Sequence, residues 1–413
     1  MGDPLYVHGV TLAAFVIMLV KVVVAFAALM LAVMIVIWFE RKVISDMQSR
    51  IGPNRAGPWG MMQTLADGIK LFFKEDLIPG QANRKVFKLA PYLVIVPAFV
   101  AFSIIPIGGI VTVAGHSFEL QVADPPIGIL LLLAMSSMAV YGVMLAGWGS
   151  GSKYPLLGSV RASAQMISYE AVLGITVTSV VLVTGSLSTR AMVASQAASV
   201  LDWNVFRLGV VPFLLFFVAI TAELNRPPFD LVEAEQELVA GYVTEYSSIR
   251  FALFFLAEFM NAITMSAVMV TLFFGGPDGP RFHAVIWLWP ILWFVGKTLV
   301  FLFIYVWLRA ALPRLRYDQL MELGWKVLIP IALGWLLVVG AVVVDRWWGL
   351  VVAAGLIGAM ALLGRAMAVG RGEAEGEAAA LASVDSTGGG DGGPRAGTAG
   401  TATVGVAWRE GDA

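Results

Sequence analysis

The chain has no cysteine among its 413 residues. Disulfides, thiolate-held iron–sulfur clusters and cysteine zinc sites are therefore excluded within it. Its three histidines, His8, His116 and His283, are widely scattered, whereas a membrane cytochrome usually carries paired axial histidines on facing helices. We expect no metal site, and any fixed redox centre that works with this chain should belong to another subunit.

Charge is also scarce. Charged residues make up 13% of the chain, hydrophobic residues make up 59%, and the mean hydropathy is +0.84. Soluble domains are far less apolar, so the composition predicts a polytopic membrane protein. Residues 1–10 lack the basic start and small-residue cleavage site of a secretory signal, and we expect the first apolar run to be retained.

Long apolar runs predict an all-α fold with about nine transmembrane helices. The predicted spans are Val10–Phe39, Pro91–Ile107, Ile127–Trp148, Gln165–Thr184, Leu208–Ala222, Phe251–Phe274, Val285–Ala311, Val327–Val344 and Leu350–Val369. The first run would reach about 45 Å, against a hydrocarbon core of about 30 Å, which predicts a long, tilted helix. Residues 1–370 form the predicted membrane domain, and residues 371–413, rich in Gly and Ala, form a predicted disordered tail.

The loop after the first span contains a second, shorter helical pattern. Met62, Leu65, Ile69 and Phe72 recur at helical spacing among polar residues. This pattern is typical of an amphipathic helix lying in the membrane interface. An ordinary helix packed beneath the loops fits the same spacing equally well.

Loop charge predicts the orientation. The first loop holds nine basic residues: Arg41, Lys42, Arg50, Arg55, Lys70, Lys74, Arg84, Lys85 and Lys88. The next loop, Gly108–Pro126, holds none. The amino terminus is therefore expected outside, and the odd-numbered loops and the carboxyl terminus in the cytoplasm.

Carboxylates gather in residues Ala222–Ser247, which we call the acidic segment, on the predicted cytoplasmic side. They are Glu223, Asp230, Glu233, Glu235, Glu237 and Glu245, with Glu258 one helix further on. Crowded carboxylates repel one another, which raises some pKa values towards neutrality and allows proton exchange under working conditions.

A simpler explanation of the acidic segment covers only part of it. A helix beginning at Pro227-Pro228 would place Asp230, Glu233 and Glu237 on one face. Acids in the first turns of a helix favour its dipole, which accounts for Asp230 and Glu233. It leaves Glu235, Glu237 and Glu245 unexplained, so we favour a functional role for the cluster.

Ionisable residues inside spans are functional candidates because burying them in hydrocarbon is costly. Glu170, Glu258 and Lys297 qualify, and structural ion pairs between helices are the alternative. Glu40 and Arg41, at the inner end of the first span, are either functional or mark a helix end where charged side chains reach the surface cheaply.

Two long motifs resemble the H-subunit family of respiratory complex I, the proton-pumping NADH–quinone oxidoreductase. One runs from Glu40-Arg41-Lys42 through Arg50-Ile51-Gly52-Pro53-Asn54 to Asp67-Gly68-Ile69-Lys70, and the other is Ala222-Glu223-Leu224-Asn225-Arg226-Pro227-Pro228-Phe229-Asp230. Residues Ala164–Glu170 and Pro313–Leu320 support the match. The resemblance covers the first to the eighth span, and leaves the ninth helix and the tail without a role.

This resemblance implies a quinone tunnel at the junction with the peripheral arm, with no residue of this chain directly catalytic. The residues implied to line or support the tunnel are Glu40, Arg41, Trp59, Asp67, Phe255, Arg309 and Arg314. Those implied to transfer protons are Glu223, Asp230, Glu233, Glu235 and Glu237, continued inward by Tyr169, Glu170 and Glu258.

The resemblance also implies the surroundings of the chain. The substrate would be a quinone, ubiquinone or menaquinone, and FMN and iron–sulfur clusters would lie only in partner subunits. The expected partners are the A, J, K, L, M and N subunits of the membrane arm, the B, C/D and I subunits of the peripheral quinone site, and the lipid bilayer, with no nucleic acid. The expected location is the bacterial plasma membrane.

Two alternatives remain open. The homologous membrane subunit of a membrane-bound hydrogenase or formate hydrogenlyase shares the acidic segment, although the motifs of the first loop favour complex I. A stand-alone ion transporter usually has internal repeats and broken helices in matching halves, and the sequence offers neither.

The first prediction concerns Glu235, the carboxylate that the simpler explanation accounts for least. Glu235→Gln should reduce quinone-linked proton pumping in an assembled complex, because the amide cannot take up a proton at neutral pH. Pumping would be measured in membrane vesicles. A wild-type pumping rate in this variant would remove Glu235 from the proton path.

Overall fold

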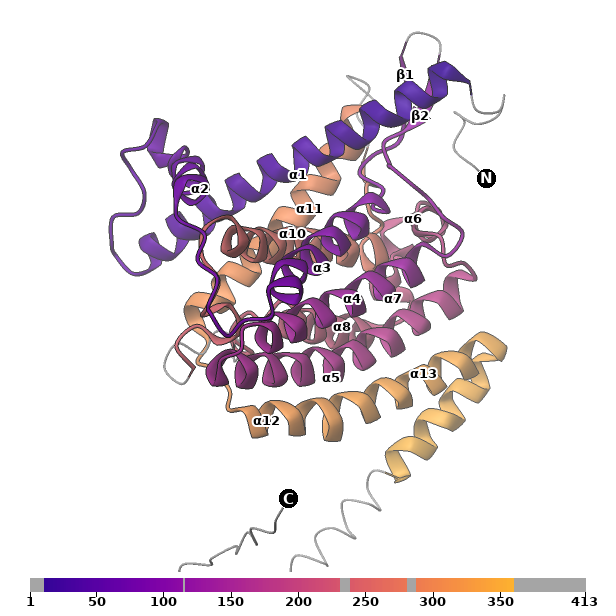
Figure 1. Cartoon of the computed structure of the whole chain (residues 1–413). Coiled ribbons are helices and arrows are strands. Elements are labelled where there is room, and N and C mark those ends of the chain that lie inside the picture. Colours follow the sequence, from indigo (N-terminus) through magenta and orange to yellow (C-terminus); the bar gives the residue numbers. More distant parts are fainter. Residues whose placement is uncertain (1–10, 114–115, 231–237, 281–286, 360–413) are drawn as a thin grey trace, which may run out of the picture. The chain divides into compact units, whose positions relative to one another are not determined.

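A computed structural model describes residues 11–113, 116–230, 238–280 and 287–359. The chain divides into two compact units, Met1–Val352 and Ala353–Ala413. Within these residues, seven helices are long and apolar enough to cross a membrane, and they confirm the predicted all-α, multi-pass membrane fold (Figure 1). They are α1 (Leu12–Met47), α3 (Arg84–Ser103), α4 (Gly128–Gly149), α5 (Lys153–Thr184), α10 (Ser248–Phe273), α11 (Leu288–Ala311) and the continuous run Tyr317–Val344.

In the described residues, two of the nine predicted spans correspond to shorter apolar helices, of 10–17 residues. Helix α8 (Val210–Glu223) has 14 residues, about 21 Å of helix. Gly209, at a φ of 82°, separates it from the short α7 (Asn204–Arg207). The described part of the last predicted span is the helix Arg346–Ala359.

The first helix is long, as predicted, and extends beyond its predicted end at Phe39. Helix α1 contains 36 residues, about 54 Å of helix. The side chain of Thr11 accepts a hydrogen bond from the Ala14 N–H and so caps its amino end. One face buries Leu29 and Val33 against α10 and α11, while the other face is exposed and apolar. Such a one-sided helix suits the edge of a membrane bundle.

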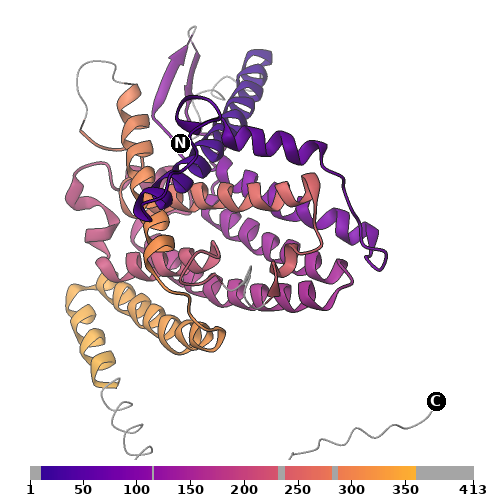
Figure 2. The same ribbon diagram turned by 90° about the vertical axis from the view of Figure 1, so that its left-hand side faces the viewer.

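Helix α10 is the centre of the bundle. It is the most deeply buried of the long helices, and it packs against α1, α3 and α11 (Figure 2). Helices α3, α4, α5 and α8 pack in sequence beside it, and α13 (Ile329–Val344) packs on α5. A π-helical turn, Leu323–Leu328, joins α13 to α12 (Tyr317–Glu322).

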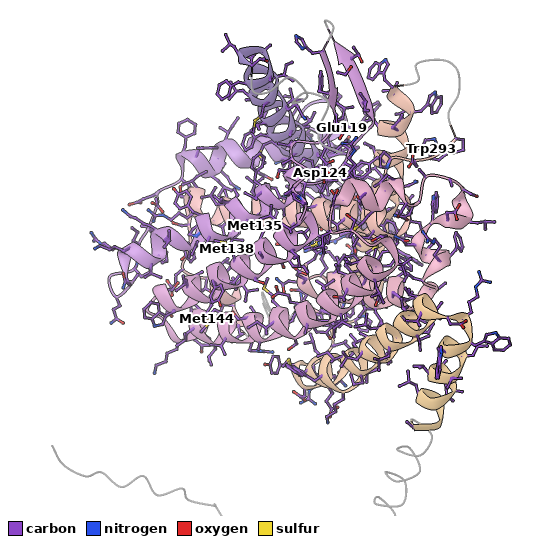
Figure 3. All side chains as sticks on the ribbon, turned by 90° about the vertical axis from the view of Figure 1, so that its right-hand side faces the viewer. Glu119, Asp124, Met135, Met138, Met144 and Trp293 are labelled. Carbon is purple, nitrogen blue, oxygen red and sulfur yellow. The ribbon has the colours of Figure 1, made fainter. Side chains whose placement is uncertain are left out.

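A small β-hairpin lies in the loop that has no basic residue. Strands β1 (Ile110–Val113) and β2 (His116–Glu119) pair antiparallel, with Ile110 opposite Glu119. Glu119 pairs with Arg190, and the Ser188 hydroxyl lies 2.8 Å from an oxygen of Asp124. Figure 3 places Glu119, the last residue of β2, and Asp124 at one end of the bundle, and Met135, Met138 and Met144 along α4. Two loops predicted to share a side are thus in contact, and the second of them contains α6 (Thr189–Ala194), which carries Arg190.

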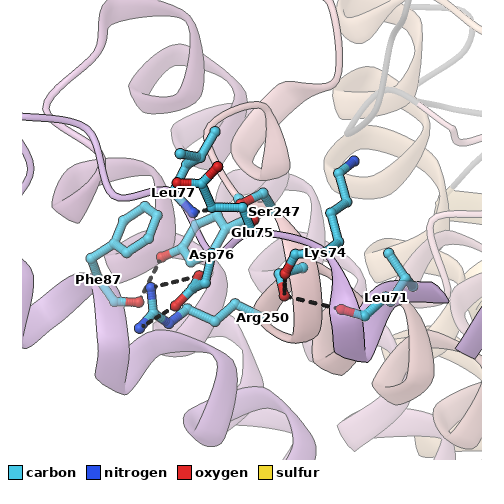
Figure 4. A network of polar contacts seen from close by, with 10 residues as sticks. Leu71, Lys74, Glu75, Asp76, Leu77, Phe87, Ser247 and Arg250 are labelled. Atoms are coloured by element: carbon cyan, nitrogen blue, oxygen red, sulfur yellow. Dashed lines mark hydrogen bonds and ion pairs between the residues drawn. The ribbon is translucent and has the colours of Figure 1, made fainter. Parts of the chain in front are cut away.

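The first loop also contacts the end of the acidic segment. Arg250 forms an ion pair with Asp76 at 2.9 Å, and the Leu77 N–H donates to the Ser247 hydroxyl at 2.9 Å (Figure 4). The Ser248 hydroxyl donates to the Lys74 carbonyl at 2.8 Å. These contacts hold together two segments that the charge pattern assigns to the same side of the membrane.

The predicted amphipathic helix is α2 (Gln63–Phe73). It has no buried residue, and its apolar side chains Leu65, Ile69 and Phe72 are exposed. This exposure favours a helix lying at the membrane interface over one packed beneath the loops.

Close packing of α5 against the 3₁₀ turn Gly241–Val243 generates the second prediction. A Cβ at Gly158 would lie 2.8 Å from the Cα of Gly241, so backbone meets backbone there. Gly158→Ala should therefore destabilise the protein by about 1–3 kcal/mol, lowering the midpoint of thermal melting.

The matched control lies on the same helix. A Cβ at Gly174 would meet nothing within 4 Å. Gly174→Ala should leave the melting midpoint unchanged or raise it, because alanine favours a helix over glycine by up to about 1 kcal/mol. Equal melting midpoints for the two variants would contradict the proposed contact.

Candidate functional site

A polar cavity opens among apolar helices where α8 ends. Residues from α3, α4, α8, α10 and α11 surround it. Its polar lining is Ser136, Glu223, Asn225, Arg226, Asp230, Tyr242, Glu258, Asn261 and Arg309. Four of these were predicted as site residues: Glu223, Asp230, Glu258 and Arg309. The fold therefore brings together candidates from three separate parts of the sequence: the acidic segment, α10 and α11.

The turn after α8 shapes one wall of this cavity. Leu224 closes the helix by donating its N–H to the Ile220 carbonyl at 2.8 Å. Asn225 follows with a φ of 51°, a left-handed conformation that asparagine tolerates better than most residues. The chain reverses there, and the side chain of Arg226 is buried.

Gln165 on α5 fixes this turn. Its side-chain amide donates to the carbonyls of Ala222 at 2.8 Å and Phe229 at 2.9 Å, and to the Asn225 side chain at 3.2 Å. Gln165 is fully buried, and a buried acceptor left without a hydrogen bond costs free energy, so these bonds stabilise the turn. Gln165 was not predicted as a site residue. The sequence feature that could have identified it is a polar amide side chain within a mostly apolar predicted span.

Arg226 is the centre of a group of charges that we call the arginine cluster: Glu40, Arg226, Glu258 and Arg309. Its guanidinium lies 2.5 Å from Glu40 and 3.9 Å from Glu258, and Arg309 pairs with the other oxygen of Glu40. Arg226 and Glu40 are buried and need such partners, whereas the side chains of Glu258 and Arg309 are partly exposed. Glu40 is 4% exposed, so it is an internal ion-pair partner and not merely a helix end.

An aromatic ring lies against the same guanidinium. Arg226 lies 4.9 Å from the centre of the Phe259 ring, a cation–π contact. The ring of Phe255, a predicted tunnel residue, lies 4.9 Å from that of Phe259. Arg226 was missed as a site residue, although it is the one basic residue between Glu223 and Ser247.

Two carboxylates of the site are bound by serine hydroxyls of α4. Ser136 donates to Glu223 of α8, and Ser137 donates to Glu170 of α5. Glu223 is 3% exposed, and its second oxygen has no hydrogen-bond partner among the described residues. Neither serine was nominated from the sequence, since a serine inside an apolar helix is usually satisfied by its own backbone.

Tyr169 faces a different neighbour. Its hydroxyl donates to the Leu320 carbonyl at 3.0 Å, and its ring lies 5.4 Å from that of Phe229. The residue is fully buried. The structure therefore joins Tyr169 to α12 and to the turn after α8.

The predicted pair Arg41 and Asp67 connects α1 to α2. Their side chains form an ion pair at 2.7 Å. Burial raises the pKa of Asp67, but the hydrogen bond and charge of Arg41, aided by Gln63 and Lys70, outweigh it and lower that pKa below its ordinary value. Asp67 therefore remains ionised at neutral pH and holds α2 to α1.

The remaining predicted residues lie at the edges of the site. Arg314 forms an ion pair with Asp230 at 2.8 Å, and the Leu315 N–H donates to the Pro228 carbonyl at 2.9 Å. Trp59 is 73% exposed, and its carbonyl accepts from the Trp38 indole at 3.0 Å. Trp59 is thus outside the cavity lining.

Residues 231–237 lie outside the described part of the chain, and with them Glu233, Glu235, Glu237 and most of the helix predicted after Pro228. The intramembrane Lys297 has a structural explanation. Its ammonium group donates to the carbonyls of Phe274, Gly276 and Asp278 beyond the end of α10. The three backbone carbonyls thus accept hydrogen bonds from the ammonium group and stabilise its positive charge.

Comparison with known proteins gives consistent results. The sequence matches the protein family described as NADH dehydrogenase over residues 20–340. It is 52% identical over 326 residues to the NADH-quinone oxidoreductase H subunit of Frankia alni, covering 78% of this chain and 71% of that one. The same protein of Frankia casuarinae is 52% identical over 325 residues, with the same coverage. That of Streptomyces avermitilis is 50% identical over 332 residues, covering 78% and 72%.

The arginine cluster generates the third prediction. Arg226→Gln leaves Glu258 without this cation and should cost about 3–5 kcal/mol of stability. Glu40→Gln combined with Arg226→Gln should cost less than the sum of the single changes, by about 1–3 kcal/mol, because the two residues are coupled. Thermal melting of the four proteins in the cycle measures this difference.

The exposed pair Arg316 and Asp318, 3.4 Å apart, is the matched control. The same cycle with Arg316→Gln and Asp318→Asn should be additive to within about 0.5 kcal/mol. Additivity in both cycles would show that Glu40 and Arg226 do not stabilise each other.

Proposed function

Because the chain belongs to the H-subunit family of NADH-quinone oxidoreductases, and is a membrane subunit of that oxidoreductase complex, we propose that its cavity couples quinone reduction to proton translocation. The observation that carries this proposal is the arginine cluster. It opens on the same cavity as Glu223 and Asp230. Buried charges joined to titratable acids in one cavity respond together to any new charge nearby.

The quinone would reach this region between α1 and α2. An isoprenoid tail needs apolar walls, and the apolar side chains of both helices are exposed. The pair Arg41 and Asp67 fixes α2 beside α1. The headgroup of ubiquinone or menaquinone would react beyond the top of the tunnel, in a peripheral subunit, with Arg309, Arg314 and Phe255 supporting the wall.

The charge of the reduced quinone would act on the arginine cluster. A quinone that accepts two electrons also needs protons, so negative charge accumulates until protons arrive. The Arg226 guanidinium forms ion pairs with two carboxylates at different distances, 2.5 Å from Glu40 and 3.9 Å from Glu258. A negative charge nearby would shift this sharing and change the proton affinity of Glu258 and Glu223.

Protons would then move along the carboxylates of this chain. The undescribed acids Glu233, Glu235 and Glu237 would lead towards the cavity, and Glu223, Glu170 and Glu258 would lead inward to neighbouring membrane subunits. FMN and the iron–sulfur clusters would reside in the peripheral partners. On this proposal the amino terminus lies outside, and the acidic segment lies in the cytoplasm of a bacterial cell.

The alternatives fit less well. Relatives at 50–52% identity carry the name of the NADH-quinone oxidoreductase H subunit, which favours that complex over a hydrogenase. Membership of a family of complex subunits argues against a stand-alone ion transporter.

The fourth prediction tests the quinone role. Arg41→Ala removes the partner of Asp67 and should weaken NADH–quinone reduction, while NADH oxidation by an artificial acceptor in the peripheral arm stays intact. Both rates would be measured in membranes that contain the whole complex. Lys42→Ala, a neighbouring basic residue with no assigned role, is the control and should leave both rates unchanged.

Loss of both rates in Arg41→Ala would indicate damaged assembly. An unchanged quinone reduction rate would remove Arg41 from the proposed tunnel.

A further inference from the structure

Two adjacent serines of α4 each donate to a carboxylate from a different helix. Ser136 binds Glu223 of α8, and Ser137 binds Glu170 of α5. We call Ser136 and Ser137 the serine pair. The proposed proton path accounts for the two glutamates, but it does not account for these hydroxyls.

The helix geometry places the two contacts side by side. Consecutive residues of an α-helix point about 100° apart, so one turn of α4 presents one hydroxyl towards α8 and the other towards α5. Helix α5 packs against both α4 and α8. The two carboxylates therefore come together where the three helices meet, and each has its own hydroxyl on α4.

A hydroxyl suits a carboxylate that changes its protonation state. It donates a hydrogen bond to the ionised acid, and it can turn and accept a hydrogen bond from the neutral acid. Ser137 has a second acceptor for its own proton, because the Leu133 carbonyl lies 3.1 Å away. Ser137 can therefore satisfy both protonation states of Glu170 without movement of the helices.

Glu223 is held at only one of its oxygens. Ser136 binds one oxygen, and the other is buried with no hydrogen-bond partner in the described residues. Both residues border the cavity. This geometry fixes the rotamer of Glu223 through one oxygen and leaves the other to exchange a proton.

A buried serine of the central helix, Ser266, behaves differently. Ser266 of α10 is fully buried and donates to the Ala262 carbonyl of its own helix at 2.7 Å. That bond is the usual one for a buried helical serine. The hydroxyls of the serine pair, in contrast, donate hydrogen bonds to side chains of neighbouring helices.

We propose that Ser136 and Ser137 are positioning residues for proton transfer between Glu223 and Glu170. The inference rests on the proposed function. In the transfer, the O–H bond of neutral Glu223 breaks and an O–H bond forms on the Glu170 carboxylate, with water carrying the proton between them. The serines keep their own protons, and no electrons move.

The test measures protons translocated per NADH oxidised, in inverted membrane vesicles that contain the whole complex. Misplacing a reacting group by ~1 Å can cost about 100-fold in rate. Ser136→Ala combined with Ser137→Ala should therefore lower this ratio by about twofold or more. NADH oxidation by an artificial acceptor should not change. Ser136→Thr and Ser137→Thr keep the hydroxyls and should restore the ratio.

Ser266→Ala is the matched control, since it removes a buried hydroxyl that serves only its own helix. It should leave the ratio at the wild-type value. A wild-type ratio in the double alanine variant would overturn the proposal. So would failure of the threonine variants to restore the ratio, or an equal loss in Ser266→Ala. If the double alanine variant does not assemble, Ser136→Cys replaces it, and a wild-type ratio there would also overturn the proposal.

Glu223→Gln and Glu170→Gln, assayed in parallel, separate this inference from the proposed function. If both glutamine variants pump normally, the proposed function is wrong for these acids. If they lose pumping while the serine variants keep it, only the role of the serine pair fails.

Discussion

The sharing of one buried guanidinium, that of Arg226, between Glu40 and Glu258 is the constraint on which the site depends. A charge in this position is tolerated only with partners of good geometry, because its desolvation costs several kcal/mol. The partners come from α1 and α10, and Arg309 of α11 completes the balance. The turn after α8 must therefore hold the Arg226 side chain in a fixed position. Two hydrogen bonds fix this turn: one from the Gln165 side chain to the Phe229 carbonyl, and one from the Leu315 N–H to the Pro228 carbonyl.

The fold was largely predictable because hydropathy identifies stretches that match the membrane. It does not identify where a helix ends. Helix α5 begins at Lys153, well before the predicted Gln165, and α1 continues to Met47, past the predicted Phe39. In both helices the additional turns carry charged residues, which lower the hydropathy without breaking the helix. The β-hairpin at Ile110–Glu119 was not predicted, because a short pair beside glycines gives little periodic signal.

The site was predictable only in part, for a similar reason. Glu40, Asp230 and Glu258 were nominated because charge in an apolar chain is conspicuous by itself. Gln165, Ser136 and Ser137 are polar residues whose importance depends on their partners. Ser136 and Glu223 are 87 residues apart in the sequence, and Ser137 and Glu170 are 33 apart. Local spacing contains no information about such pairs, so they appear only once the helices are packed.

The site consequently contains carboxylates of two kinds. Those in the arginine cluster, Glu40 and Glu258, form ion pairs with guanidinium groups. Those bound by the serine pair face neutral hydroxyls, which serve the ionised and the neutral form alike. On the proposed function, the two kinds of carboxylate have different roles in coupling. The negative charge of the reduced quinone would change the ion pairs of the arginine cluster. Protons would be taken up and passed on at Glu223 and Glu170, where neutralisation breaks no ion pair.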